Sequence, residues 1–307
     1  MKKMLLMLLA ATIVGAGVMP VDASAASKKK VRVSKHIKPV KHARPSHRRA
    51  ADGVVSPLAL SSSAVLVQDQ STGAVLYEKN PGVVLPIASI TKLMTAMVVL
   101  DAEPDLQETL AIGDEDVDAL KGTHSRLRVG TQLTREEMLR LALMSSENRA
   151  ASSLSRYYPG GQQAFVSAMN AKAQMLGLAD TRFADPTGLR PANVSSPRDL
   201  ARMVDAAHQY PLIREFTTTT EEAVNVAGRL QQFRNTNVLI KNPSWEIGLS
   251  KTGFINEAGR CLVMQAWINS KPVIIVLLDS VGKMTRIGDA NRIKNWFEAS
   301  AHGRPTS

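Results

Sequence analysis

The chain has 307 residues, which is long enough for one domain with a sizeable hydrophobic core. Its formal net charge is +11, but residues 1–51 hold 12 Lys and Arg against a single acid, Asp22, and the remainder is balanced. The charge excess therefore belongs to the N-terminal segment and does not mark the folded part as a nucleic-acid-binding domain. The single cysteine, Cys261, excludes an intramolecular disulfide, and because it lies in an apolar run we expect a buried, unreactive thiol.

The first 25 residues have the three parts of an export signal. Lys2 and Lys3 form a basic start, an apolar stretch of about 14 residues follows, and residues 23–25 (Ala-Ser-Ala) form a small-residue cleavage site. The apolar stretch is shorter than the ~20 residues that a membrane-spanning helix needs. We therefore expect residues 1–25 to be a signal peptide and the protein to be exported to the periplasm.

Residues 26–54 are expected to form a basic linker. The run from Lys28 to Arg49 contains no acid, few large apolar residues and two prolines, a composition that predicts disorder because it cannot bury a core. Its charge predicts weak electrostatic contact with an anionic wall or membrane surface, and a purely solubilising role is the alternative. Nucleic acid is not an expected partner, since the run lies behind an export signal. Residues 55–300 are predicted to form one folded domain and residues 301–307 a short tail.

Two strands open the folded part. Residues 64–69 and 74–79 are strand-like and are separated by Gln70-Ser71-Thr72-Gly73, a pattern that predicts a hairpin. Pro86-Ile87-Ala88 then leads into an apolar helix that carries Ser89 and Lys92. Ser89 would thus lie at a helix N-terminus, where free backbone N–H groups and the helix dipole favour negative charge.

Start and stop signals predict several helices in the middle of the chain: a capping box at Thr134 and Glu137, a stretch over 162–176 stopped by Gly177, and a start at Ser196, Pro197 and Asp199. The helix that starts at Thr134 is expected to end at residues 145–146, and a further helix is expected to begin near Arg149. Ser146 and Asn148 would then lie in a helix–helix connection, where their side chains can point into a cleft.

The last third of the chain changes to strand patterns. Residues 247–252, 261–268 and 273–279 read as an antiparallel meander, and residues 292–299 as a closing helix. Strands at both ends with helices between them predict an α+β fold. We expect one antiparallel sheet built from N- and C-terminal strands, flanked by helices, with a mostly helical subregion.

Three short motifs occur in a fixed order. Ser89-Ile-Thr-Lys92 places a serine and a lysine on one helix face, and a desolvated, neutral lysine can remove the serine proton. Ser146-Glu147-Asn148 begins 57 residues later, and Lys251-Thr252-Gly253 begins 105 residues after that. The first motif alone is common by chance, but the ordered set is the signature of penicillin-binding proteins and class A β-lactamases.

Two other classes of hydrolase do not match the motifs of this sequence. A Ser-His-Asp hydrolase would have to use His124 or His208, the only histidines in the main body, and no G-x-S-x-G elbow is present. A zinc hydrolase is not expected either, because no H-E-x-x-H occurs. We therefore expect neither a metal nor a cofactor.

With these motifs, residues 60–300 resemble the low-molecular-mass penicillin-binding proteins, the serine D-alanyl-D-alanine peptidases. The stretches PIASITKLMTAMVVLDA, LALMSSENRAA, FADPTGL and LSKTGF carry the resemblance. It implies an antiparallel sheet beside a helical region with the active site between them. It also implies peptidoglycan peptides as substrates and β-lactams as covalent inhibitors.

The resemblance also implies a role for each motif residue. Ser89 would attack a D-alanyl carbonyl, Lys92 would be its general base and Ser146 would relay a proton to the leaving amine. The remaining implied groups are substrate-binding Asn148, Lys251, Thr252 and Gly253, and an oxyanion hole made by the backbone N–H groups of Ser89 and Phe254. Lys251 is further expected to keep Lys92 neutral by like-charge repulsion.

Departures from related patterns narrow the expected activity. The stretch Asp185-Pro186-Thr187-Gly188-Leu189 lacks the glutamate with which class A β-lactamases activate water, so efficient β-lactam hydrolysis is not expected. The chain stops soon after its closing helix, without the second domain of many carboxypeptidase relatives. We therefore expect a D,D-endopeptidase that cleaves D-alanyl–diamino-acid cross-links. The alternatives are a D-alanyl-D-alanine carboxypeptidase and a β-lactam sensor or wall-binding module that does not turn over.

Overall fold

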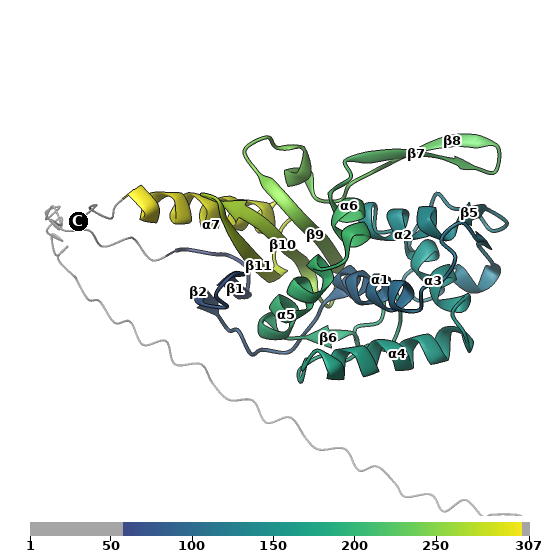
Figure 1. Cartoon of the computed structure of the whole chain (residues 1–307), viewed down its shortest axis with the longest axis horizontal. Coiled ribbons are helices and arrows are strands. Elements are labelled where there is room, and N and C mark those ends of the chain that lie inside the picture. The colour runs from purple at the N-terminus through teal and green to yellow at the C-terminus, as the bar shows by residue number, and fades with distance from the viewer. Residues whose placement is uncertain (1–57, 303–307) are drawn as a thin grey trace, which may run out of the picture. The chain divides into compact units, whose positions relative to one another are not determined.

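The computed structural model describes residues 58–302 (Figure 1). The predicted signal peptide, the predicted linker and residues 303–307 of the predicted tail lie outside the described residues. The strands are β1 (Ala64–Asp69), β2 (Val75–Lys79), β3 (Leu85–Pro86), β4 (Thr109–Ala111), β5 (Gln132–Thr134), β6 (Val194–Ser195), β7 (Glu221–Val226), β8 (Arg229–Arg234), β9 (Glu246–Ile255), β10 (Gly259–Ile268) and β11 (Lys271–Ser280). The helices are α1 (Thr91–Asp101), α2 (Arg135–Met144), α3 (Asn148–Arg156), α4 (Gly161–Met175), α5 (Pro197–His208), α6 (Pro211–Thr218) and α7 (Thr285–His302), with 3-10 turns η1 (Ala88–Ile90), η2 (Asp114–Asp116) and η3 (Val238–Lys241).

A five-stranded antiparallel sheet forms one half of the fold, with strand order β2-β1-β11-β10-β9. β1, from the start of the domain, pairs with β11, from its end, over the register Ala64 opposite Leu278 to Asp69 opposite Val273. The predicted combination of N- and C-terminal strands in one sheet is therefore confirmed. β9 forms an edge of the sheet and lies beside the helical region (Figure 1).

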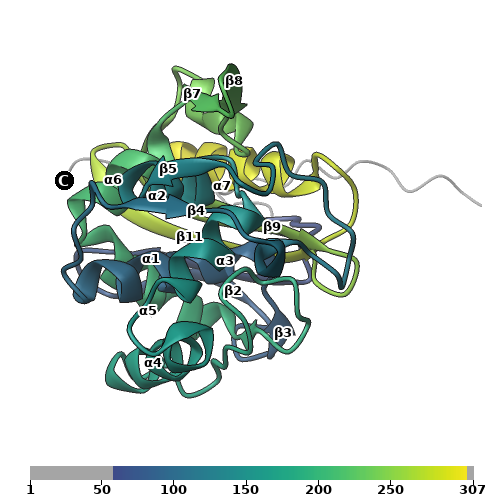
Figure 2. The same cartoon turned by 90° about the vertical axis from the view of Figure 1, so that its right-hand side faces the viewer.

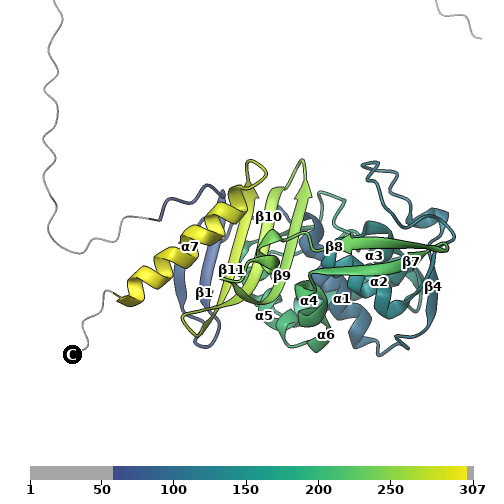
Figure 3. The same ribbon diagram turned by 90° about the horizontal axis from the view of Figure 1, so that it is seen from above.

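Both faces of the three strands β1, β11 and β10 are buried, which explains why these strands are largely apolar. Val65 and Val67 point to one face, where Ile287, Ala290 and Ile293 of α7 cover them in a small core. The alternate residues of the strands point to the opposite face and join the main core with the other helices. Figure 3 shows α7 along one side of the sheet and the helical region beyond β9. Cys261 is fully buried, and burial raises the pKa of its thiol to about 11, as expected for an unreactive thiol.

The helical region is built around α1. Leu93, Met94 and Met97 have no exposed surface, and the helix is buried over almost its whole length, because other helices surround it. A helix that is apolar on all sides is stable only in such a central place. The first turn of α1, which carries Lys92, is thereby held inside the molecule.

Several predicted details are confirmed and a few need correction. The capping box of α2 is present, with Glu137 N donating to Thr134 Oγ1 at 3.1 Å. Asn148 is not in a connection but is the first residue of α3, whereas Ser146 does precede that helix. The closing helix begins at Thr285 rather than near residue 292. Gly288 weakens the local helix signal there, and packing of the helix on the sheet overrides this low propensity.

One hairpin was not predicted. β7 and β8 pair antiparallel through a turn at Ala227 and Gly228, which have φ values of 50° and 79°. This double positive φ is typical of a two-residue hairpin turn. The hairpin extends away from the sheet over the helical region (Figure 1), and Figure 2 shows it nearly end-on at the top of the view, above α6 and β5. Within the described residues, none of the helices combines the length and the apolar character that a membrane span requires.

Candidate active site

The three motifs come from separate parts of the fold and meet at one cleft. Ser89 lies in η1, directly before α1, Ser146 lies between α2 and α3, and Lys251-Thr252-Gly253 lies within β9. The cleft has a volume of ≈ 270 Å³ and is lined by Ser89, Thr123, Ser146, Asn148, Leu189, Thr236, Thr252, Gly253, Phe254 and Arg286. Of the predicted site residues, Lys92 and Lys251 do not reach this wall, because both are buried.

The amine of Lys92 lies among three oxygen atoms. Its Nζ is 2.9 Å from Ser89 Oγ, 2.7 Å from Asn148 Oδ1 and 2.7 Å from the carbonyl oxygen of Thr187. The side chain has no exposed surface. The helical spacing of three residues places the lysine on the same face as the serine, as the sequence predicted.

These contacts suit a neutral amine that acts as a base. A neutral lysine has two N–H bonds and one lone pair. Asn148 Oδ1 and Thr187 O cannot donate, so they take the two N–H bonds. The lone pair then faces the third neighbour, Ser89 Oγ, whose hydroxyl can donate to it. The amine of Lys92 can therefore remove the proton of the Ser89 hydroxyl.

Burial is the main reason why this amine can be neutral. It lowers the pKa of Lys92 to about 7, because the charged form loses its hydration, while the carboxylates of Asp185 and Glu147 oppose the shift. The expected repulsion by Lys251 is therefore not the principal cause. Burial, together with the charges of Lys92 and Arg286, also lowers the pKa of Lys251 well below its usual value.

Ser146 adopts a backbone conformation that is unusual for a residue with a side chain. Its φ of 62° is left-handed, which costs ~1–2 kcal/mol for a residue other than glycine. Lys251 Nζ donates to Ser146 Oγ at 2.9 Å and to the carbonyl oxygen of Thr252 at 3.1 Å. The strained residue thus holds a hydroxyl at the cleft wall, next to a buried amine.

β9 approaches the turn that carries the nucleophile very closely. A Cβ atom added to Gly253 would lie 2.8 Å from Ile87 O and 3.3 Å from Ser89 N. The resemblance implies that Gly253 binds substrate, and the glycine also leaves room for the turn formed by Ile87, Ala88 and Ser89. Beside it, Thr252 Oγ1 donates to Thr236 Oγ1 at 2.7 Å, and the Phe254 side chain is 50% exposed at the cleft edge.

The loop at residues 185–190 presents the Thr187 carbonyl to Lys92. Asp185 Oδ1 accepts from Thr187 N at 2.6 Å and from Gly188 N at 2.7 Å, and Asp185 Oδ2 accepts from Arg190 N at 2.9 Å. The carboxylate therefore organises the loop from inside. From the sequence, only the missing glutamate of this stretch was considered. A backbone carbonyl can accept a hydrogen bond in any residue type, so the role of Thr187 O could not be predicted.

Thr123 and Asp118 fix the orientation of the Asn148 amide. Asn148 Nδ2 donates to Thr123 Oγ1 at 3.1 Å, and Thr123 Oγ1 donates in turn to Asp118 Oδ2 at 2.7 Å. Because the hydroxyl proton is used on the carboxylate, the hydroxyl oxygen can only accept from Asn148. The amide oxygen is thereby turned towards Lys92. These two loop residues were missed, since the loop matches no motif.

Arg286 was also missed, because it lies far along the chain in α7. The residue is 9% exposed, and its NH1 donates to the carbonyl oxygen of Gly253 at 3.0 Å. Its Nε is buried and has no hydrogen-bond partner within residues 58–302. Burial, aided by the charge of Arg260, lowers the pKa of the guanidinium, which nevertheless stays charged because arginine is not deprotonated in proteins. The wall of the cleft therefore carries a fixed cation beside β9.

Comparison with known proteins agrees with this geometry. Residues 51–282 match the family model described as D-alanyl-D-alanine carboxypeptidase. The chain is 55% identical over 241 residues to the D-alanyl-D-alanine endopeptidase of Pseudomonas aeruginosa, covering 78% of each chain. It is 48% identical over 253 residues to the D-alanyl-D-alanine endopeptidase of Escherichia coli, covering 82% of each chain.

A solved structure shares the fold. The crystal structure of a Streptomyces DD-transpeptidase is similar with a TM-score of 0.74 and 29% identity, over 80% of this chain and 100% of that chain. The expected α+β architecture is thus confirmed. The family match and the two relatives show that this chain belongs to the serine D-alanyl-D-alanine peptidases, the low-molecular-mass penicillin-binding proteins.

Proposed function

We propose that the chain is a serine D,D-endopeptidase that cleaves D-alanyl–diamino-acid cross-links of peptidoglycan through an acyl-enzyme on Ser89. The observation that carries the proposal is the buried amine of Lys92, 2.9 Å from Ser89 Oγ, with both of its N–H bonds directed to fixed acceptors. The two relatives at 55% and 48% identity, both endopeptidases by name, support the preference for cross-links.

Acylation begins with attack of Ser89 Oγ on the D-alanyl carbonyl carbon. As the O–C bond forms, the hydroxyl proton passes to the lone pair of Lys92 and the carbonyl oxygen becomes negative. The backbone N–H groups of Ser89 and Phe254, which border the cleft, stabilise that oxyanion. Each such donor is worth ~3–4 kcal/mol in the transition state.

Collapse of the intermediate then breaks the C–N bond. The leaving amine needs one proton, and the proton that Lys92 took from Ser89 is relayed to it through the hydroxyl of Ser146, which Lys251 Nζ holds at 2.9 Å. Lys92 is thereby neutral again. Water then adds to the ester carbonyl as neutral Lys92 takes one of its protons, and Lys92 passes that proton to Ser89 Oγ as the Ser89 O–C bond breaks and releases the acid. Asn148 and Thr252 bind the peptide backbone during both steps, and no cofactor takes part.

The positive side of the cleft supports a position beside β9 for the leaving half of the substrate. A diamino acid joined to D-alanine at its D-centre carries a carboxylate next to the amide that is cut. Arg286 is the fixed cation on the cleft wall, and Thr252 and Thr236 offer hydroxyls close by. We assign the leaving-side carboxylate to this group.

Export and the basic linker belong to the same proposal. Peptidoglycan lies outside the cytoplasm, so the signal pattern of residues 1–25 fits this substrate. Removal of residues 26–50 is expected to leave turnover of a small soluble substrate unchanged, and to weaken binding to whole walls at low salt. A fall in soluble-substrate turnover would contradict the linker interpretation.

The direct test is digestion of purified cross-linked peptidoglycan, followed by mass analysis of the products. We expect dimers to be converted to monomers, with much slower release of D-alanine from monomeric pentapeptide. Ser89→Ala should abolish both this conversion and labelling by a fluorescent penicillin. Ser71→Ala, at an exposed turn, is the matched control and should behave like the wild type.

Three outcomes would change the proposal. Equal rates on pentapeptide and dimers would replace the endopeptidase by a carboxypeptidase. Labelling by penicillin without turnover of either peptide would favour a β-lactam sensor. Persistent labelling of Ser89→Ala would show that the nucleophile is another residue.

A further inference from the structure

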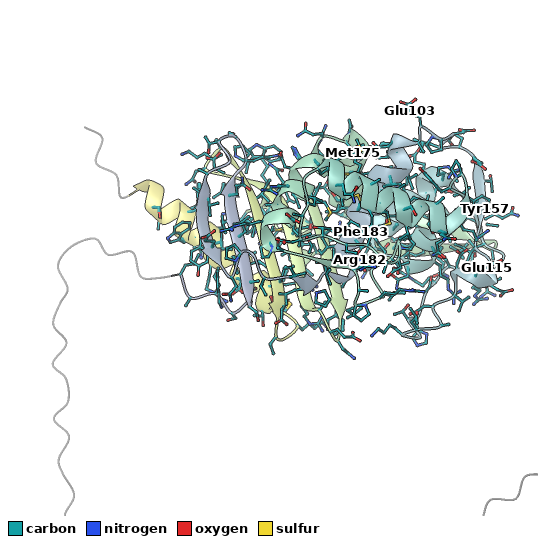
Figure 4. The ribbon with its side chains drawn as sticks, turned by 90° about the horizontal axis from the view of Figure 1, so that it is seen from below. Glu103, Glu115, Tyr157, Met175, Arg182 and Phe183 are labelled. Atoms are coloured by element: carbon teal, nitrogen blue, oxygen red, sulfur yellow. The ribbon has the colours of Figure 1, made fainter. Side chains whose placement is uncertain are left out.

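One ion pair joins the two walls of the cleft. Lys121, in the loop that follows η2, pairs with Glu257, in the turn between β9 and β10. Thr123, which follows Lys121 closely in the chain, lines the cleft on its helical side, and Phe254, shortly before Glu257, lines it on the β9 side. Figure 4 shows Glu115, from η2, at the end of the helical region opposite the sheet. The loop therefore returns from that end to the cleft and contacts the sheet half across it.

The tip of this loop is held by its own carboxylate, independently of the ion pair. The side chain of Asp118 accepts from three backbone N–H groups, each at 2.9 Å, which are those of Leu120, Lys121 and Thr123. Thr123 in turn accepts from Asn148. Within residues 58–302, no other hydrogen bond or ion pair connects residues 117–124 to β9, β10 or the turn between them. The two charged side chains can thus separate without displacing the groups that orient Asn148.

Water competes for both partners of this ion pair. The side chain of Lys121 is 28% exposed and that of Glu257 is 41% exposed. The hydrogen bond from Lys121 lowers the pKa of Glu257, which therefore stays ionised at neutral pH. An exposed pair of this kind changes an equilibrium only ~2–5-fold, because solvent screens the charges and two long side chains lose freedom. The contact is therefore weak enough to open and close during turnover.

The kind of ligand decides whether the ion pair obstructs it. The cleft has its volume of ≈ 270 Å³ with the pair formed, so a small β-lactam can enter without opening it. A cross-link in whole peptidoglycan is different, because both of its peptides remain attached to glycan strands. Such a substrate has no free end that could pass between joined walls. It must be laid between the walls sideways, so Lys121 and Glu257 have to separate to admit it.

We propose that the Lys121–Glu257 ion pair controls the access of cross-linked peptidoglycan to Ser89, opening to admit a substrate that is tethered at both ends. This inference rests on the proposed function, because it concerns the entry of the same substrate. Lys121 and Glu257 are specificity-determining residues, which contact no reacting atom and transfer no proton. Their contact separates tethered substrates from small ligands, which reach the nucleophile with the pair formed.

A removable covalent bridge provides the test. In the double variant Lys121→Cys and Glu257→Cys, a short bis-methanethiosulfonate reagent joins the two thiols in place of the ion pair, and a reducing agent releases them. Cys261 is fully buried and should not react. Because the open state cannot form, bridging should slow cleavage of whole peptidoglycan at least ~100-fold and change penicillin acylation less than about threefold. Reduction should restore cleavage. Each single cysteine variant, treated with the same reagent, is the control.

Removing the charge tests the same contact without a bridge. Lys121→Gln should raise kcat/KM on whole peptidoglycan ~2–5-fold, since the closed state is no longer favoured, and leave penicillin acylation unchanged. Exchanging the charges, with Lys121→Glu and Glu257→Lys together, should return the wild-type rate. Lys271→Gln, at an exposed position at the start of β11, is the matched control. A lower kcat/KM for Lys121→Gln would overturn the proposal, because the pair would then hold bound substrate and not oppose its entry.

Competition distinguishes failure of this proposal from failure of the proposed function. Whole peptidoglycan that occupies the cleft slows labelling of Ser89 by a fluorescent penicillin, whether or not it is cleaved. Covalent bridging should remove this competition, and reduction should restore it. Competition that bridging leaves unchanged would refute the access role. If the proposed function fails instead, the unbridged enzyme leaves cross-links intact, although bridging still removes the competition.

Discussion

The hydroxyl of Thr123 accepts a hydrogen bond from the side-chain amide of Asn148 at 3.1 Å. The Thr123 hydroxyl donates its own proton to Asp118 and can therefore only accept a hydrogen bond from Asn148. The amide must then direct its nitrogen towards the threonine. The amide oxygen therefore faces Lys92 Nζ, at 2.7 Å. A loop outside the three motifs thus determines how the second motif meets the first.

Thr123→Val should slow acylation by penicillin ~10–100-fold, because it leaves the amide nitrogen without its partner. It should also lower the pH midpoint of the reaction, since an amide that turns its N–H₂ towards Lys92 disfavours the protonated amine. Thr123→Ser keeps the hydroxyl and should restore both rate and midpoint. Acylation rates measured across pH provide the check. A slower reaction with an unchanged midpoint would indicate a merely structural role for Thr123.

The pH profile of the wild type is a second prediction. Lys92 must be neutral to accept the serine proton, and burial lowers its pKa to about 7. Below that pH the amine is protonated and the acylation rate should fall about tenfold per pH unit, whereas above it the rate should reach a plateau. The second-order rate of penicillin acylation between pH 5 and 9 tests this. A rate that still rises about tenfold per pH unit between pH 8 and 9 would show that the base is not an amine whose pKa is lowered to about 7.

Gly188 provides a third prediction, because it packs against the turn that carries the nucleophile. A Cβ atom added there would lie 2.0 Å from Ala88 O, and the φ of Gly188 is +84°. Gly188→Ala should therefore displace the Ser89 turn, reducing both acylation and the melting temperature. Gly228→Ala is the control, with a φ of +79° and no atom within 4 Å of the added Cβ. It carries only the backbone cost of ~1–2 kcal/mol, so its acylation rate should be normal. Equal loss in both variants would mean that backbone strain, and not the close contact, is responsible.

The sequence predicted the parts of this fold in which local signals and packing agree. The capping box at Thr134 and Glu137 and the apolar strands 261–268 and 273–279 lie where the pattern placed them. The hairpin of β7 and β8 was missed, although Val224, Val226 and Phe233 are buried at alternate positions. Exposed polar residues between them weaken the alternation, and the Ala-Gly turn is a weaker signal than Asn-Gly.

The site could be predicted only as far as its chemistry lies in side chains with fixed spacing. Ser89 in η1 and Lys92 in the first turn of α1 are three residues apart in one continuous helical stretch, so their contact follows from helix geometry. The other acceptor, Thr187 O, belongs to the backbone and could be any residue type. Arg286 is brought to Gly253 by the packing of α7 on the sheet, a contact between distant segments that no local pattern contains.

Arg286 gives the last prediction, which concerns substrate choice. Its guanidinium is the fixed cation on the β9 side of the cleft, and we assign it to the carboxylate of the leaving half. Arg286→Gln should therefore raise KM for a dimer with a free leaving-side carboxylate by ~10–100-fold, the cost of one charge-assisted hydrogen bond. A dimer amidated at that carboxylate should lose much less. Arg286→Lys keeps the charge without the planar fork and should recover part of the affinity.

The steady-state comparison of the two dimers separates binding from folding. Because Arg286 NH1 also holds Gly253 O, its loss disturbs β9 and lowers the rates for both substrates alike. Only a charge contact produces a difference between the free and the amidated dimer. If Arg286→Gln slows both dimers by the same factor, then Arg286 acts through the position of β9. The leaving-side carboxylate would in that case be bound by the hydroxyls of Thr252 and Thr236, which lie 2.7 Å apart on the same wall.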